Sequence, residues 1–503
     1  MSRPPLALLA VVVLLAGGTA VASTTGSPAP PRHEAPASVD VVGATAVCPD
    51  LRQTRAPGQR KDLLQTRISV GSAPGAARRQ AVGGSIGLLR GASKGNPAPV
   101  PVTRPGEVAV DLATDVDRDG LVVTARGPLA AGLEVEQVTR GEQGIDRGLA
   151  GLRCEAPRTD AWFAGGATVV GDKALLVLAN VDDTPALADV QVWSASGPVD
   201  PRAGQGITVA PHTRTLLHLE ELAPDRSRLA VHVSTRRGRV AAALRHASYV
   251  GRVARGVDWV PDAEPPATRV VVPGIPAGPG ARAVVVTNPG TDDTIVSIRV
   301  TTRSGEFVPT GFAAVAVPAG TSVAKQLTAL TKDTAMAVTV TSVGGPVLAG
   351  AVVQDGQTGP VRELSYTAAS PPLSGPALVT DVVLDQPTES TLILSALDGD
   401  ASVVVTPVRL VGRPGPLPGP KTVRVPGGRT TTLRLSTFFP PGATARLAVE
   451  VRPGPGSGPV YAARYLRERG ATGPLTTIID LKGPALQVPR PAVVRDPAVG
   501  ATG

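Results

Sequence analysis

Gly83–Gly87 is one of several short motifs in this 503-residue chain whose residue types could support chemistry. The segment reads GGSIG and matches G-x-S-x-G, in which a strained turn between strand and helix exposes a nucleophilic serine above a parallel sheet. No alternation of strands and helices accompanies the match here. Because 57 residues of the chain are glycine, we expect a chance match and no hydrolase nucleophile at Ser85.

A second motif, Asp115-Val116-Asp117-Arg118-Asp119-Gly120, matches the first half of a calcium-binding loop. The twelfth position is Arg126 instead of the bidentate glutamate, so the motif lacks a ligand and gains a positive charge. We expect a hairpin turn between strands at Val108–Leu112 and Leu121–Ala125. Calcium binding by Asp115, Asp117 and Asp119 stays open as the alternative.

Four histidines and two pairs of aspartates are candidates for metal binding or acid–base chemistry. His212, His218, His232 and His246 fall within about a hundred residues, but zinc needs three or four converging ligands and strand alternation puts His218 and His232 on the polar face of a sheet. Asp182-Asp183 and Asp292-Asp293 recur at the same place after an Asn turn, which favours turn chemistry over an acid–base pair. We therefore predict no catalytic residue, no cofactor and no metal site.

These residues must be held by many short strands. Ile295–Thr301 alternates between two faces, Asn288-Pro289-Gly290 makes a turn, and the pattern over Ala283–Val353 recurs upstream and downstream. Aromatic residues make up 2% of the chain, so its cores must be aliphatic, and 51 prolines with the glycines suit frequent turns. A short helix is expected around Ala76–Leu89.

The repeats predict an all-β fold of tandem immunoglobulin-like antiparallel β-sandwich repeats. The alternative is a closed pseudo-fourfold ring of β units, which would bring the N- and C-terminal units together. The expected segments are a signal peptide or N-terminal anchor, a disordered spacer, an N-terminal β unit closed by a disulfide, three β-sandwich repeats and a tail, at 1–22, 23–38, 39–160, 161–265, 266–378, 379–485 and 486–503, respectively.

The N-terminus indicates an extracytoplasmic address. Arg3, an apolar run from Leu6 and the ending Ala20-Val21-Ala22 form a secretory signal, with an uncleaved anchor as the alternative. In an exported protein the only two cysteines, Cys48 and Cys154, are expected to form a disulfide between the first and last strands of the N-terminal unit. The protein is then secreted or anchored to the outer face of the cytoplasmic membrane, with no other membrane contact.

The formal net charge is +9, and the densest basic stretch contains Arg236, Arg237, Arg239, Arg245, Arg252 and Arg255. An anionic partner would use such a cluster, but no nucleic-acid motif accompanies it, and we expect a solvated face. Aromatic residues near the repeat boundaries, at Trp162, Trp259 and Tyr366, are expected to pack between units rather than to bind a ligand.

The chain resembles an actinobacterial exported family catalogued as domain of unknown function 5719. The resemblance rests on Trp162–Thr168, on the Val284–Gly290 strand and turn, on Pro318-Ala319-Gly320, and on the Cys48-Pro49 pair with a second cysteine at Cys154. It covers roughly Val39 to Leu481. The last repeat departs from the pattern, since Asp398-Gly399-Asp400 stands in place of the Asn turn. Membership implies an envelope-associated protein of high-GC Gram-positive bacteria and implies no catalytic residue.

These observations favour a non-catalytic, extracytoplasmic structural or protein-interaction protein of the cell envelope. Its expected partner is an envelope protein or an anionic envelope polymer, and not nucleic acid. The alternative function is an envelope polysaccharide-binding module, although twelve aromatic residues leave few platforms for sugar rings. A hydrolase is disfavoured because no nucleophile, base and orienting group converge in the pattern.

Overall fold

The computed structural model describes residues 38–49, 64–74, 83–91, 95–110, 120–356, 362–384, 388–413, 415–439, 445–484 and 486–489. The predicted signal or anchor at 1–22 and the spacer up to residue 37 lie outside them. Ser38, assigned to the spacer, begins strand β1 (Ser38–Asp40), which pairs with β37 (Gln487–Pro489) in the predicted tail. This ladder belongs to one compact part of the chain, and Val41–Leu486 forms the other.

Val41–Leu486 is all-β, as predicted, and its sheets are built almost entirely of antiparallel pairs. We divide it into four units in chain order. The first unit contains β2 (Gly43–Cys48), β3 (Leu64–Ser72), β4 (Ser85–Arg90), β5 (Ala98–Pro99), β6 (Glu107–Ala109), β7 (Leu121–Arg126), the 3₁₀ turn η4 (Gly127–Leu129), β8 (Leu133–Gly141) and β9 (Gly148–Arg153).

The second unit contains β10 (Asp160–Ala164), β11 (Asp172–Asn180), β12 (Ala186–Ser194), β13 (Gly197–Pro198), η5 (Pro201–Gly204), β14 (Ile207–Val209), β15 (Thr213–His218), α2 (Leu219–Leu222), β16 (Ala230–Arg237), β17 (Ala241–Val250), β18 (Val253–Val260) and β19 (Asp262–Ala263). The third contains β20 (Arg269–Ile275), β21 (Gly280–Thr287), β22 (Thr294–Thr302), β23 (Gly305–Phe307), β24 (Val315–Val317), β25 (Ser322–Gln326), α3 (Thr328–Thr331), β26 (Met336–Ser342), β27 (Leu348–Asp355) and β28 (Glu363–Ala368).

The fourth unit contains β29 (Ala377–Val383), β30 (Glu389–Ala396), β31 (Ala401–Leu410), β32 (Lys421–Val425), β33 (Arg429–Arg434), α4 (Leu435–Phe438), β34 (Arg446–Pro453), β35 (Val460–Gly470) and β36 (Gly473–Asp480). One strand order recurs in the last three units: their second sheets run β15-β11-β17-β18, β25-β21-β27-β28 and β33-β30-β35-β36. The predicted repetition is therefore present in the sheet order itself.

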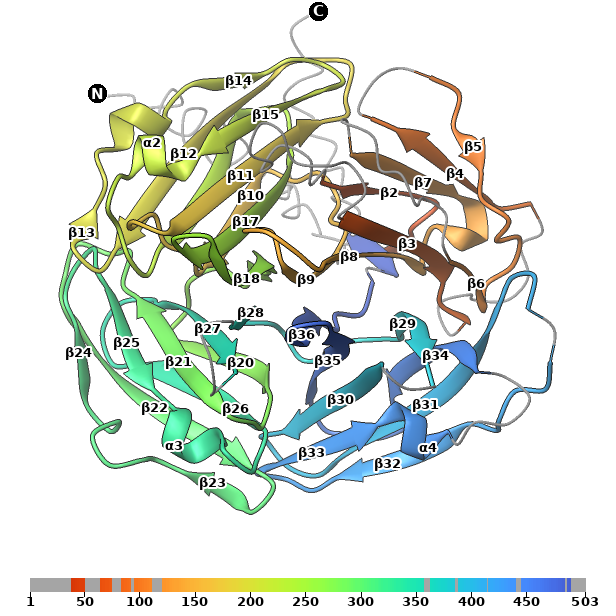
Figure 1. The fold of residues 1–503 in the computed structure, drawn as a ribbon. Coiled ribbons are helices and arrows are strands. Elements are labelled where there is room, and N and C mark those ends of the chain that lie inside the picture. Colours follow the sequence, from red (N-terminus) through yellow and green to blue (C-terminus); the bar gives the residue numbers. More distant parts are fainter. Residues whose placement is uncertain are drawn as a thin grey trace, which may run out of the picture. The chain divides into compact units, whose positions relative to one another are not determined.

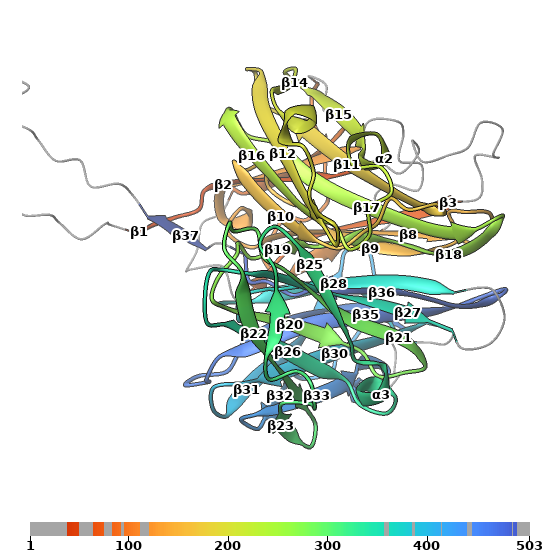
Figure 2. The same ribbon diagram turned by 90° about the vertical axis from the view of Figure 1, so that its left-hand side faces the viewer.

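The four units close on one another (Figure 1). Strand β31 of the fourth unit pairs in parallel with β6 of the first, with Leu410 opposite Val108, so a single sheet spans both units. One strand from each unit, β9, β18, β28 and β36, packs on the others in the middle, and the side view shows β18, β28 and β36 stacked there (Figure 2). The contacts between the first and fourth units agree with the closed ring, which is the alternative prediction. A linear string of sandwich repeats, the first prediction, would lack them.

Each unit buries an aliphatic core between its two facing sheets. In the second unit Leu176 and Leu244 of one sheet meet Val190 and Val231 of the other, all at most 3% exposed. That core also contains Tyr366 from β28 of the third unit. Alternation places one face of each strand in a core. Because Tyr366 of the third unit lies in the core of the second, neighbouring units share parts of their cores, and the ring is one packed body.

The predicted disulfide is present. Cys48, the last residue of β2, is bonded to Cys154, which follows β9, with Cα atoms 4.6 Å apart and a sequence separation of 106 residues. The bond joins the two sheets of the first unit, because β2 pairs with β7 and β9 pairs with β8.

The Asn turns of the repeats are held by the same hydrogen bonds. Asn180 Nδ2 donates to the carbonyl oxygens of Thr184 and Val209, and Asn288 Nδ2 donates to those of Asp292 and Val317. In the last repeat an alanine, Ala396, occupies the position of the Asn residue. Ala396 pairs with Arg429, which lies four residues after Val425 in the sequence. Asp400 nevertheless accepts from the Gly427 amide as Asp293 does from Ala319, which settles the register of that repeat.

Two local predictions are wrong. A helix is expected around Ala76–Leu89, but Ser85–Arg90 forms strand β4, and Ile86 and Leu88 point into the first unit's core. Residues 76–82 are outside the described part. The expected hairpin between Val108–Leu112 and Leu121–Ala125 does not form, because β6 pairs with β3 and β31 whereas β7 pairs with β2 and β4. Asp115, Asp117 and Asp119 lie outside the described residues.

Within the residues that the structure covers, every helix is too short to cross a membrane.

Candidate functional site

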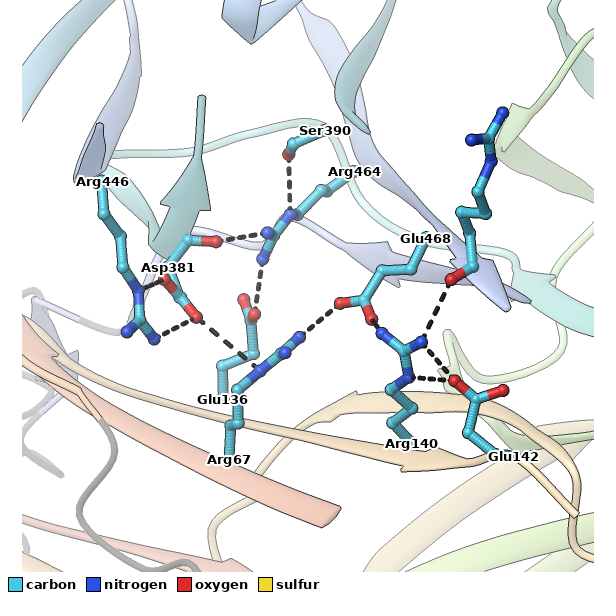
Figure 3. Close-up of polar contacts among 10 residues, drawn as sticks. Arg67, Glu136, Arg140, Glu142, Asp381, Ser390, Arg446, Arg464 and Glu468 are labelled. Carbon is cyan, nitrogen blue, oxygen red and sulfur yellow. Dashed lines mark hydrogen bonds and ion pairs between the residues drawn. The ribbon is translucent and has the colours of Figure 1, made fainter. Parts of the chain in front are cut away.

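The seam between the first and fourth units is lined by charged side chains that meet across it (Figure 3). Arg464 of β35 is 2% exposed and pairs with Glu136 of β8, whose carboxylate accepts at 2.5 Å. The same guanidinium donates to Ser390 Oγ at 2.9 Å and to the Asp381 carbonyl oxygen. Burial raises the pKa of Glu136, although Arg464 opposes the shift.

A chain of alternating charges continues along this seam. Arg446 binds Asp381 through both carboxylate oxygens, and Glu468 accepts from Arg67 at 2.6 Å and from Arg140 at 2.8 Å. Arg140 also pairs with Glu142. Since guanidinium and carboxylate groups are equal in number here, the seam is neutral, and its charges join the two units rather than attract a ligand.

At the centre of the ring, one carboxylate connects all four units. Asp258 of β18 is 0% exposed and accepts hydrogen bonds from the Gly151 amide, the Thr477 hydroxyl and the Tyr366 amide, which belong to the first, fourth and third units. Burial raises the pKa of Asp258 well above its usual range, against these hydrogen bonds. A single buried carboxylate therefore joins the four units at the centre of the ring.

Arg147 makes a second central contact. Its guanidinium lies 3.3 Å from Glu363 and donates to the carbonyl oxygens of Gly473 and Pro474. Burial raises the pKa of Glu363 well above its usual range, with Arg147 acting in the opposite direction. This contact joins the first, third and fourth units.

A cluster of charges lies beside the second unit. Lys482 Nζ is 2.9 Å from Asp480 and 3.7 Å from Asp262, and Asp262 accepts from Arg158 at 2.9 Å. Burial raises the pKa of Asp262 to about 6, against the attraction of Lys482 and Arg158. Burial favours the neutral amine of Lys482, but Asp480 and Glu155 outweigh it and raise the pKa of that amine.

We predict that Asp262 makes the stability of the protein depend on pH. The folded carboxyl holds its proton to about pH 6, whereas the unfolded one loses it near 3.8. The folded state thus binds more protons in this window, and its stability falls as pH rises from about 4 to 6. Relative to Asp262→Asn, the wild type should lose on the order of 1–3 kcal/mol between pH 4 and 7, as measured by urea denaturation at several pH values.

The matched control for this prediction is Asp333→Asn, which alters an exposed aspartate of the third unit. Its stability should follow the wild-type profile at every pH. Parallel profiles for the wild type and Asp262→Asn would contradict the prediction.

A cleft of about 510 Å³ opens between the third and fourth units. Its lining combines hydroxyl, carboxylate, guanidinium, aromatic and aliphatic groups, contributed by Pro276, Ala277, Gly278, Pro279, Ala335, Asp355, Gly356, Glu389, Thr391, Ile393, Thr432, Arg434, Tyr465, Arg467 and Pro474. This size lies within the range of small-molecule sites in proteins, about 300–1,000 Å³.

Strand β35 positions one wall of this cleft. Its residues alternate, so Arg464 and Glu468 point to the seam while Tyr465 and Arg467 line the cleft. Tyr465 donates its hydroxyl proton to Asp355 Oδ2 at 2.8 Å, and Asp355 also pairs with the buried Arg282. Burial raises the pKa of Tyr465 well above its usual range, and the nearby Asp355 carboxylate adds to this shift.

The histidines singled out in the sequence lie apart. His212 contacts Asp183 at 2.9 Å, His232 contacts Asp160 at 2.7 Å and stacks on Trp162, and His246 contacts Tyr366 and Asp172. His218 lies 3.6 Å from Glu220. In the described part of the chain, no three His, Cys, Asp or Glu side chains come together as a metal site would require.

The remaining candidates from the sequence are Ser85 and the cluster of arginines. Ser85 begins strand β4. Arg236 and Arg239 pair on the surface with Asp189 and Asp182, as expected of a solvated face, but Arg245 is 2% exposed and pairs with Asp146, so it does not belong to that face.

The expectation that boundary aromatics pack between units is confirmed for two of them. Tyr366 belongs to the core of the second unit, and Trp259 packs on Ala150 of the first.

Sequence reasoning missed the charged residues that join the units. Asp258 interrupts the apolar run Val257–Val260 and Arg464 interrupts the apolar run Val460–Leu466, and this interruption is the only signal that could have marked them. Glu363 is the first residue of β28 and carries no such signal. A single charge in an apolar strand reveals that a partner is needed, but not which strand supplies it.

The fold and these contacts define a class of protein: an all-β ring of four two-sheet units, closed by the pairing of β31 with β6 and by buried ion pairs, with one disulfide inside the first unit. Residues 109–436 match the model of a family described as Family of unknown function (DUF5719), and the chain belongs to that family. No curated protein matches the chain.

Proposed function

We propose that the protein is a non-catalytic, extracytoplasmic structural or protein-interaction protein of the cell envelope. The observation that supports the proposal is the burial of ion pairs between units, such as Arg464–Glu136 and Arg147–Glu363, whose side chains are each at most 5% exposed. A body locked in this way keeps its outer sheet edges and loops in fixed positions, as a docking protein requires.

Two features support the extracytoplasmic location. The Cys48–Cys154 disulfide is consistent with an oxidising compartment, and the N-terminal sequence has the pattern of a secretory signal or anchor. We take the facing sheets of each unit to be an immunoglobulin-like sandwich and the source to be an actinobacterium.

In-cell crosslinking tests this function. The chromosomally tagged protein is crosslinked in living cells and purified, and the attached molecules are identified. We expect a reproducible envelope protein among them. Recovery with cell-wall polymer alone, released by salt or by glycan digestion, would contradict the protein-interaction role.

The second candidate function is the binding of envelope polysaccharide. It is favoured by the cleft between the third and fourth units, where Tyr465, Thr391 and Thr432 line one space. Hydroxyl groups and an aromatic ring are groups to which sugars bind, through hydrogen bonds and through stacking, respectively.

A further inference from the structure

The charges of the cleft do not cancel. Asp355 is neutralised by Arg282, which is 0% exposed, and Glu389 pairs with Arg434 at 3.0 Å. Arg467 also lines the cleft and lies opposite Glu389 in the register of β30 and β35. Among the described residues, no hydrogen bond or ion pair engages the Arg467 guanidinium. Two guanidinium groups thus flank one carboxylate, and the cleft keeps one uncompensated positive charge.

We infer that this cleft binds a sugar unit bearing one anionic group, a carboxylate or a phosphate. Arg467 supplies charge-assisted hydrogen bonds to the anionic group. The hydroxyls of Thr391 and Thr432 and the carboxylate of Glu389 can exchange hydrogen bonds with the sugar hydroxyls, and Tyr465 offers its ring to the apolar face of the sugar. This inference rests on the second candidate function rather than the first.

The walls of the cleft are held in place before any ligand enters. The Tyr465 hydroxyl is bonded to Asp355, and Thr476 also lies within 3.4 Å of that carboxylate. Strand β35, which carries Tyr465 and Arg467, is attached to the first unit through Arg464 and Glu468. Because Tyr465 and strand β35 are fixed by contacts elsewhere, binding orders mainly the Arg467 side chain, and its entropic cost is small.

Isothermal titration calorimetry on the full exported chain tests this inference. The probes are a disaccharide of glucuronate and N-acetylglucosamine, the same disaccharide with its carboxyl group reduced to an alcohol, and glucose 6-phosphate. We expect the anionic probes to bind and the reduced disaccharide to bind at least about tenfold more weakly. The stronger of the two anionic probes identifies the anionic group as carboxylate or phosphate.

Variants locate the binding. Arg467→Gln should weaken binding of the anionic probe at least about tenfold, because it removes the uncompensated charge, and Arg467→Lys should restore part of it. Arg202→Gln is the matched control, since it removes the same charge from an exposed residue of the second unit, 89% exposed at its side chain. Arg467 is itself exposed, so its substitution should leave the melting temperature unchanged.

Equal weakening by Arg467→Gln and Arg202→Gln would mean general attraction to a basic protein and would overturn the inference. Equal binding of the reduced and acidic disaccharides, or no binding of any probe, would also overturn it. None of these results bears on the crosslinking experiment, so the cleft can fail as a sugar site while the protein-interaction role stands.

Discussion

Replacing both Cys48 and Cys154 with alanine is expected to lower the free energy of unfolding by about 2–5 kcal/mol. The disulfide closes a loop of 106 residues, and in the chain-entropy model a loop of about that length contributes roughly 4.7 kcal/mol by restricting the unfolded chain. Alanine is chosen because Cys48 and Cys154 are buried, and serine would add the cost of burying hydroxyl groups.

Urea denaturation with and without reductant measures the effect. The reduced wild type should unfold close to the midpoint of the double-alanine variant, and reductant should leave that variant unchanged. A shared midpoint for the oxidised wild type and the variant would show that packing and backbone hydrogen bonds hold the two sheets of the first unit together without the disulfide. One such hydrogen bond runs from the Val47 amide to the Glu155 carbonyl oxygen, at 2.9 Å, beside the disulfide.

Local pattern was enough to predict much of the fold. The alternation of Ile295–Thr301 becomes β22, and the two cysteines form the expected bond. Both features depend on few residues: strand periodicity on a single segment, and the disulfide on the only available pair. The helix expected before Leu89 failed for the opposite reason, since Ile86 and Leu88 acquire their strand conformation from pairing with β7, which lies more than thirty residues away in sequence.

The ring and the cleft depend on contacts that one sequence does not display. Asp258 could not be assigned a role because its donors, Gly151, Tyr366 and Thr477, are spread over more than three hundred residues. Two of these donors are backbone amides, which carry no sequence signal. The cleft is likewise formed from two units, and Arg467 looks like any other surface arginine until Glu389 is seen to pair with Arg434.

Arg464→Met should be the most damaging single substitution at the seam, lowering the free energy of unfolding by about 3–5 kcal/mol. Methionine keeps much of the apolar volume but leaves the Glu136 carboxylate, which is 4% exposed, without its cation. It also removes the donors to Ser390 Oγ and to the Asp381 carbonyl oxygen. Breaking a buried pair costs far more than an exposed one, because the remaining charge cannot return to water.

The cost of Arg464→Met should depend on pH with a defined sign. Burial already raises the pKa of Glu136 in the folded protein, and loss of Arg464 raises it further. A carboxyl whose folded pKa is raised destabilises the fold progressively as pH rises above its unfolded value of 4.5. The deficit of the variant relative to wild type should therefore be larger at pH 8 than at pH 4.

Two further variants separate charge from packing at this seam. Arg464→Met combined with Glu136→Leu removes both charges and should recover much of the loss, since an apolar pair often replaces a buried ion pair at little cost. Arg424→Met breaks the exposed contact with Asp400 and should leave stability almost unchanged. If the double variant is as unstable as Arg464→Met alone, the unpaired carboxylate is not the cause, and the hydrogen bonds to Asp381 and Ser390 must hold the ring closed instead.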